Sequence, residues 1–114
     1  MRITIGNKTI TSMDFSDTEK AWMIEDAILL LEHFKIKKKI VLGGDVLTEK
    51  LEYNYDSWYY NIESSRNSKF NVECSIKVAF EYISNYIRTN GKSFYVIFVT
   101  EDTRQKTEDT RQET

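Results

Sequence analysis

Residues 40–60 read IVLGGDVLTEKLEYNYDSWYY, and this stretch fixes the centre of the predicted fold. Ile40–Leu42 predicts a strand that Gly43-Gly44 interrupts as a turn or bulge with close backbone approach, and Val46–Leu51 continues or returns it. Residues 53–62 then alternate between two faces, as a second strand does. The stretch therefore predicts a pair of neighbouring strands.

Acids and aromatic rings share this stretch. The acids are Asp45, Glu49, Glu52 and Asp56, and the rings are Tyr53, Tyr55, Trp58, Tyr59 and Tyr60. Alternation places Tyr53, Tyr55 and Tyr59 on one face, whereas Trp58 and Tyr60 lie on the other. If Trp58 fills the core, Tyr55 and Tyr59 point outward beside the acids. Tyrosine gives a large contact area at low entropic cost, and clustered carboxylates attract basic partners. We therefore predict a protein-docking surface whose contacts are Asp45, Glu49, Glu52, Asp56, Tyr55 and Tyr59.

The chain before this stretch predicts a hairpin and a helix. Ile3 and Ile5 alternate with polar residues ahead of Gly6-Asn7, which suits a tight turn. Ser16-x-x-Glu19 has the spacing of a capping box, which predicts that the helix begins there and ends near Phe34–Lys35. Its apolar stripe is Ala21, Ile24, Ala27, Ile28, Leu31 and Phe34.

The chain after this stretch predicts a loop, a second helix and a strand. Residues 63–69 have loop composition, Asn71 is the expected helix cap, and Asn90-Gly91 is the expected stop. The apolar face of the helix is Val72, Ile76, Ala79, Phe80, Ile83 and Ile87. Phe94–Val99 is continuously apolar, which is typical of a central strand. Together these elements predict an α+β fold, in which two amphipathic helices pack on one mixed or antiparallel sheet of about four to five strands.

Length and composition predict one domain over residues 1–100, followed by a polar tail over 101–114 that repeats TEDTRQ. A formal net charge of −2 argues against direct nucleic-acid binding. No apolar run approaches membrane-spanning length and no leader opens the chain, so we expect a soluble, cytoplasmic protein without membrane association. We expect a monomer or a weak dimer.

Catalytic and metal-binding patterns are scarce. His33 and Cys74 are the only histidine and cysteine, too few for a zinc site of the usual ligands, and the glycines lack the spacing of a phosphate loop. We predict no catalytic residue, metal or cofactor. Two alternatives stay open: a small hydrolase that uses Asp45 or Cys74 with His33, and a generic adaptor that binds a partner strand at an exposed sheet edge.

Three short motifs resemble those of small bacterial immunity proteins that accompany polymorphic toxins, including contact-dependent growth inhibition systems. The motifs are Val41-Leu42-Gly43-Gly44-Asp45, Asp56-Ser57-Trp58-Tyr59-Tyr60, and Asn71-Val72 through Ser75, Ala79, Tyr82 and Ile83. The likeness spans about residues 40–87. It implies a non-enzymatic antitoxin that binds the C-terminal toxin domain of one partner, frequently a nuclease and often one that cuts tRNA. It assigns no binding residue.

Overall fold

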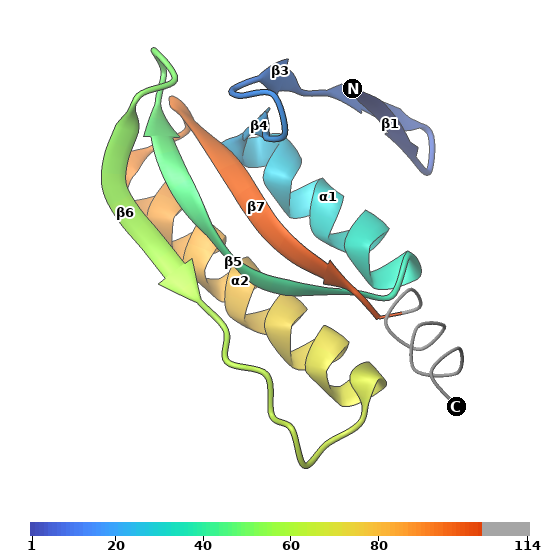
Figure 1. The fold of residues 1–114 in the computed structure, drawn as a ribbon. Coiled ribbons are helices and arrows are strands. Elements are labelled where there is room, and N and C mark those ends of the chain that lie inside the picture. The colour runs from blue at the N-terminus through green and yellow to red at the C-terminus, as the bar shows by residue number, and fades with distance from the viewer. Residues whose placement is uncertain (104–114) are drawn as a thin grey trace.

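Two helices pack against one face of a five-stranded antiparallel sheet in the computed structural model, which describes residues 1–103 (Figure 1). The elements are β1 (Arg2–Ile5), β2 (Lys8–Thr11), β3 (Met13–Asp14), β4 (Lys20–Met23), α1 (Ile24–Ile36), β5 (Lys39–Thr48), β6 (Tyr53–Tyr59), α2 (Ser68–Asn90) and β7 (Phe94–Asp102). The predicted α+β class is confirmed. Neither helix in this part of the chain combines the length and apolar character of a membrane span.

The sheet has the strand order β3-β4-β7-β5-β6, so β5 lies between the last strand and its own hairpin partner. The predicted strand pair is the β5–β6 hairpin, and the predicted central strand is β7. The β5–β7 register shifts between Val41 and Gly43, which agrees with the irregularity predicted from the glycine pair. β6 lies at one edge of the sheet, and its register is set by its pairing with β5.

The main core lies between the helices and the sheet. Trp58 on β6 stacks on Tyr82 of α2 at 5.0 Å and meets Phe98 of β7 edge to face at 5.8 Å. The other buried members of this cluster are Ile24, Ala27, Leu31, Val41, Val46, Ala79, Ile83, Tyr86 and Val96. Because Trp58 is inside, the alternate residues of β6 face away from the helices.

The first helix begins later than its capping-box motif predicts. Glu19 N donates to Ser16 Oγ at 3.1 Å, as the motif requires, but Phe15 N and Ser16 N both donate to Glu19 O and close the turn between β3 and β4. Residues 20–23 then form β4, and α1 starts at Ile24 with no side-chain cap. The motif formed its local bond in a hairpin turn, because pairing of β4 with β7 outweighed helix propensity.

The second helix begins earlier than predicted. Asn67, not Asn71, is the cap, and its side chain accepts from Phe70 N at 2.8 Å. Asn71 lies inside α2 and is only 2% exposed. The helix ends at Asn90 before Gly91, as predicted, and Phe80 is half exposed instead of buried.

The predicted opening hairpin is the β1–β2 sheet, which turns at Gly6. Its Ile10 packs with Trp22 and Leu30 in a second small cluster beside α1. At the other end β7 includes two residues of the predicted tail, and residues 104–114 of that tail lie outside the described part of the chain.

Candidate functional site

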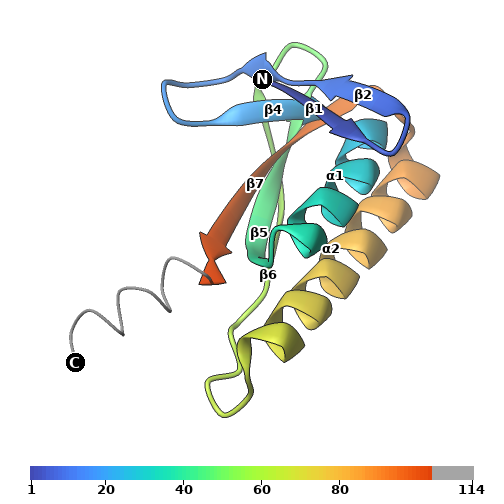
Figure 2. The same cartoon turned by 90° about the vertical axis from the view of Figure 1, so that its right-hand side faces the viewer.

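The face of the sheet opposite the helices is open beside β6. Figure 2 shows both helices on one side of the sheet, with no helix of the described chain on the other. Asp45 pairs across the ladder with Ser57 and Ile97, and Gly43 pairs with Tyr59 and Val99. Tyr59 is 78% exposed and Val99 is 49% exposed. We call the surface formed by Asp45, Ser57, Tyr59 and Val99 the open face.

Another part of that side is covered by the turn between β3 and β4. Phe15, from this turn, packs on a cluster of Ala21, Leu47 and Ile97. Its ring also meets Tyr53 edge to face at 5.3 Å. The open face therefore begins where this cover ends, and it keeps Tyr59 and Asp45 accessible on one surface.

Glu49 and Glu52 lie in the exposed turn that joins β5 to β6. Thr48 shapes this turn, because its Oγ1 accepts from the amides of Lys50 and Glu52, and its own amide donates to Glu52 O at 2.8 Å. These two acids are thus at the end of the same strand pair that carries Asp45. Three of the four predicted acids lie on the open face or in its adjoining turn.

Asp56 lies on the other side of the sheet, which corrects the expectation that it points outward beside Tyr55 and Tyr59. It has the same parity as Trp58 and faces the helices. Tyr86 Oη donates to Asp56 Oδ2 at 2.7 Å and accepts from Asn54 Nδ2 at 2.7 Å, and Asn54 Nδ2 also donates to Asp56 at 3.3 Å. Burial and the hydrogen bond to Asp56 raise the pKa of Tyr86 to about 12, so the phenol stays neutral and keeps both roles.

Tyr55 lies in a bulge that the sequence did not predict. Val46 pairs with Asp56 and Leu47 pairs with Tyr53, so Asn54 and Tyr55 have no Cα partner on β5. Tyr55 takes the left-handed conformation, with φ of 59°, and is 96% exposed. That conformation costs a residue with a side chain about 1–3 kcal/mol. Alternation of apolar residues carries no signal for such a bulge.

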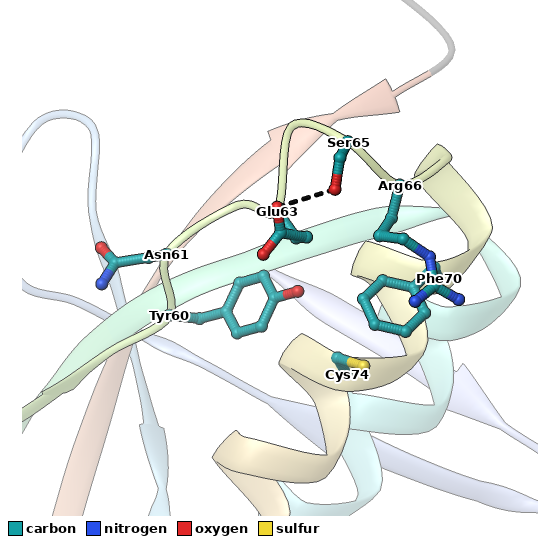
Figure 3. Close-up of a pocket in the computed structure, with 7 residues that line it drawn as sticks. All are labelled: Tyr60, Asn61, Glu63, Ser65, Arg66, Phe70 and Cys74. Atoms are coloured by element: carbon teal, nitrogen blue, oxygen red, sulfur yellow. Dashed lines mark hydrogen bonds between the residues drawn. The ribbon is translucent and has the colours of Figure 1, made fainter.

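A hollow lies where the chain leaves β6 and enters α2. Its lining residues are Tyr60, Asn61, Glu63, Ser65, Arg66, Phe70 and Cys74 (Figure 3). The Arg66 guanidinium stacks over the Phe70 ring at 3.8 Å, and Glu63 accepts from Ser65 Oγ at 2.9 Å. The polar groups of this hollow are thus partly engaged with each other.

Asn71 ties the wall of that hollow to α2. Its Oδ1 accepts from Tyr60 Oη at 2.7 Å and from Glu63 N at 2.8 Å. Its Nδ2 donates to the carbonyl oxygens of Glu63, Arg66 and Asn67. The buried side chain of Asn71 thus holds the connection between β6 and α2 in place. The prediction that Asn71 caps the helix is wrong, because an asparagine near a helix start suits both roles.

Asn71→Ala is expected to lower the free energy of unfolding by about 2–3 kcal/mol, because it leaves several part-buried groups without partners. Chemical denaturation measures this loss, and hydrogen exchange at residues 60–66 should speed up. Asn67→Ala, which removes only the cap bond, is the matched control and should cost about 1 kcal/mol. Equal losses in the two variants would contradict the tethering role.

The sheet separates Asp45 from the other two residues of the hydrolase alternative. His33 is on α1 and Cys74 is on α2, both on the helix side, whereas Asp45 is across the sheet on the open face. Burial, with Lys37 and Lys39 nearby, lowers the pKa of His33. Asp45 and Asp56 also face opposite sides, and within residues 1–103 no group of three or more His, Cys, Asp or Glu could hold a metal ion.

The adaptor alternative needs an exposed sheet edge, and the longer edge strand of the five-stranded sheet is β6, because β3 at the other edge has only two residues. The bulge at residues 54–55 interrupts this edge, so regular pairing with a partner strand is limited to its second half.

Comparison with known proteins identifies the family. Searches among curated proteins and among solved structures found no match. A family model described as Immunity protein 40 matches residues 9–100, a span that includes nearly all of the five-stranded sheet, both helices and the open face. The immunity-protein resemblance of the three motifs is thereby confirmed, and the chain belongs to the Immunity protein 40 family.

Proposed function

We propose that this chain binds and neutralises the C-terminal toxin domain of one cognate polymorphic toxin, of the contact-dependent growth inhibition type or a related type. The toxin in this proposal is a nuclease such as a tRNase, and the encounter takes place in the cytoplasm. Membership of an immunity-protein family supports a cognate toxin as the partner and a non-enzymatic role. The observation that carries the proposed surface is the exposed Tyr59 beside Asp45 on the open face.

The open face has the chemistry of a protein-binding surface. A monomer does not gain stability from a tyrosine that is 78% exposed on a sheet, whereas tyrosine is enriched among residues that dominate binding energy. Nanomolar capture corresponds to about −12 kcal/mol. Interfaces of about 1,600 Å² reach this value when a few aromatic anchors are well placed.

The acids support a nuclease as the target. An enzyme that binds nucleic acid presents lysine and arginine to the phosphates. Asp45 on the open face, and Glu49 and Glu52 in the β5–β6 turn, present the opposite charge, with Lys50 as the base in the same turn as the two glutamates. Complementary charge of this kind raises the association rate and selects against wrong partners. The proposed complex therefore covers a cationic surface of the toxin.

Co-expression with the C-terminal domain encoded directly upstream tests the function. Cells are expected to survive induction of that domain only when this chain is present, and the two proteins should co-purify. Death of the co-expressing cells, with both proteins soluble and unassociated, would disprove the proposal for that domain. In a tRNA-cleavage assay, the purified toxin domain should be inactive once this chain is bound to it.

Charge reversal tests the surface. The triple variant Asp45→Lys, Glu49→Lys, Glu52→Lys is expected to slow association about 10- to 100-fold at low salt, because steering is lost. Stopped-flow or surface plasmon resonance across a salt series measures this rate, and the difference from the wild type should shrink as salt rises.

The matched control places lysine at three exposed helix acids, Glu32 on α1 and Glu73 and Glu81 on α2. These positions are on the helix side, so their reversal should change the association rate by less than about threefold. If the control slows association as much as the triple variant, net charge explains the effect and the open face does not.

A further inference from the structure

The bulge of β6 presents Tyr55 in a way that the fold itself does not need. A bulge on an edge strand helps to prevent edge-to-edge pairing, and glycine or asparagine would adopt φ of 59° at lower cost. Tyr55 adds nothing to the core, because 96% of its surface is exposed. Strained, exposed residues of this kind persist where the surrounding structure fixes them and function uses them.

The two neighbours of Tyr55 hold it in this conformation. Asn54 and Asp56 flank it, and both side chains bond to the same phenol oxygen of Tyr86, each at 2.7 Å. Tyr86 is itself held in α2, where it stacks with Tyr82 at 6.1 Å and meets Phe94 edge to face at 5.2 Å. We call Asn54, Asp56 and Tyr86 the Tyr86 clamp.

We propose that the Tyr86 clamp holds Tyr55 in its exposed conformation as a preorganised anchor for the toxin domain, so that Asp56 and Tyr86 position the anchor and do not themselves contact the toxin. This inference rests on the proposed function. Preorganisation raises affinity because the bulge does not have to be ordered during binding.

The partner surface that fits this anchor is cationic with an apolar recess. A phenol ring that is almost fully exposed on an edge strand can enter a recess, and Arg or Lys side chains at the rim of the recess can stack on the ring. Glu49 and Glu52, in the turn just before β6, can meet the same basic side chains. The anchor and the acids thus select one kind of toxin surface.

Tyr86→Phe in the full chain is the main test, because it removes the shared hydroxyl and keeps the ring in the core. Without toxin, ¹⁵N relaxation should show that the Tyr55 amide becomes more mobile. With the toxin domain, calorimetry should show an affinity loss of about 10-fold, and Tyr55→Ala should cost less in this background than in the wild type. Tyr82→Phe, which removes a neighbouring hydroxyl and leaves the clamp intact, should change affinity less than about twofold.

Asp56→Asn separates positioning from contact. Asparagine keeps an acceptor for Tyr86 but removes the charge, so a positioning role predicts an affinity change below about threefold, and a direct ionic contact predicts a much larger loss. A rigid Tyr55 amide and wild-type affinity in folded Tyr86→Phe would overturn the inference. Failure of the wild-type chain to bind the toxin would instead overturn the proposed function, and the relaxation measurement without toxin would still decide whether the clamp orders Tyr55.

Discussion

Gly44→Ala is expected to lower the free energy of unfolding by about 3 kcal/mol or more, because the new methyl group has no space. A Cβ at Gly44 would lie 2.4 Å from Trp58 Cη2, 2.8 Å from Trp58 Cζ3 and 2.5 Å from the Ile97 carbonyl oxygen. Thermal unfolding should show the loss as a fall in Tm of about 10–20 °C.

The neighbours of Gly44 cannot move apart cheaply. Trp58 is directly opposite Gly44 in the ladder and is confined by Tyr82 and Phe98. The Ile97 oxygen belongs to the backbone of the central strand β7, which is paired on both sides. A side-chain rotation can therefore relieve only part of the overlap.

Gly6→Ala is the matched control. Nothing lies within 4 Å of a Cβ at Gly6, so only its positive φ of 64° opposes the substitution, at about 1 kcal/mol. Adding Trp58→Phe to Gly44→Ala should restore part of the lost stability, since a smaller ring removes one of the two overlaps. If Gly44→Ala unfolds no more easily than Gly6→Ala, the tight strand–ring packing described above is wrong.

The sequence predicted elements wherever one simple periodicity dominates. The alternation in residues 53–59 placed Tyr59 outward and Trp58 inward, and both positions are confirmed. The same alternation places Asp56 inward, because Asp56 is two residues from Trp58 and therefore lies on the same face. The prediction nevertheless placed Asp56 with the outward tyrosines, because Asp56 follows Tyr55 in the sequence. In a strand, such neighbours point to opposite faces.

Local motifs misled where tertiary contacts decide. Ser16 and Glu19 formed the bond expected of a capping box, but the chain beyond them paired with β7 instead of coiling. Asn71 near a helix start suits a cap, and only the folded loop of residues 60–67 shows it as a buried hub. Pairing partners distant in sequence are not encoded in any short window, which is why the start of α1 shifted, whereas α2 starts earlier because Asn67 caps it.

The bulge that exposes Tyr55 belongs to the same class of feature. It depends on where β6 leaves its register with β5 and on a hydroxyl from α2, 31 positions further along the chain. The sequence therefore predicts Tyr55 as a contact residue but does not predict the bulge that exposes it. The structure adds a conformational cost at Tyr55, and that cost can be measured separately from binding.

Tyr55→Asn is accordingly expected to change stability and affinity in opposite directions. Asparagine tolerates the left-handed conformation, so the free energy of unfolding should rise by about 0.5–1 kcal/mol. Affinity for the toxin domain should fall at least about 30-fold, the loss typical of an anchor worth 2 kcal/mol. Denaturant titration and calorimetry on the same protein measure the two effects.

Tyr55→Ala and Tyr55→Phe complete the test, because alanine changes only one of the two properties and phenylalanine changes neither. Alanine lacks the ring but keeps the conformational cost, so its affinity should fall as for asparagine without a gain in stability. Phenylalanine keeps the ring, so it should bind nearly as well as the wild type and unfold at the same denaturant concentration. A destabilised Tyr55→Asn would mean that the bulge is not strained at this residue, and wild-type binding by Tyr55→Ala would mean that the toxin is gripped elsewhere. Since Tyr55 is almost fully exposed, neither result could be attributed to damage in the core.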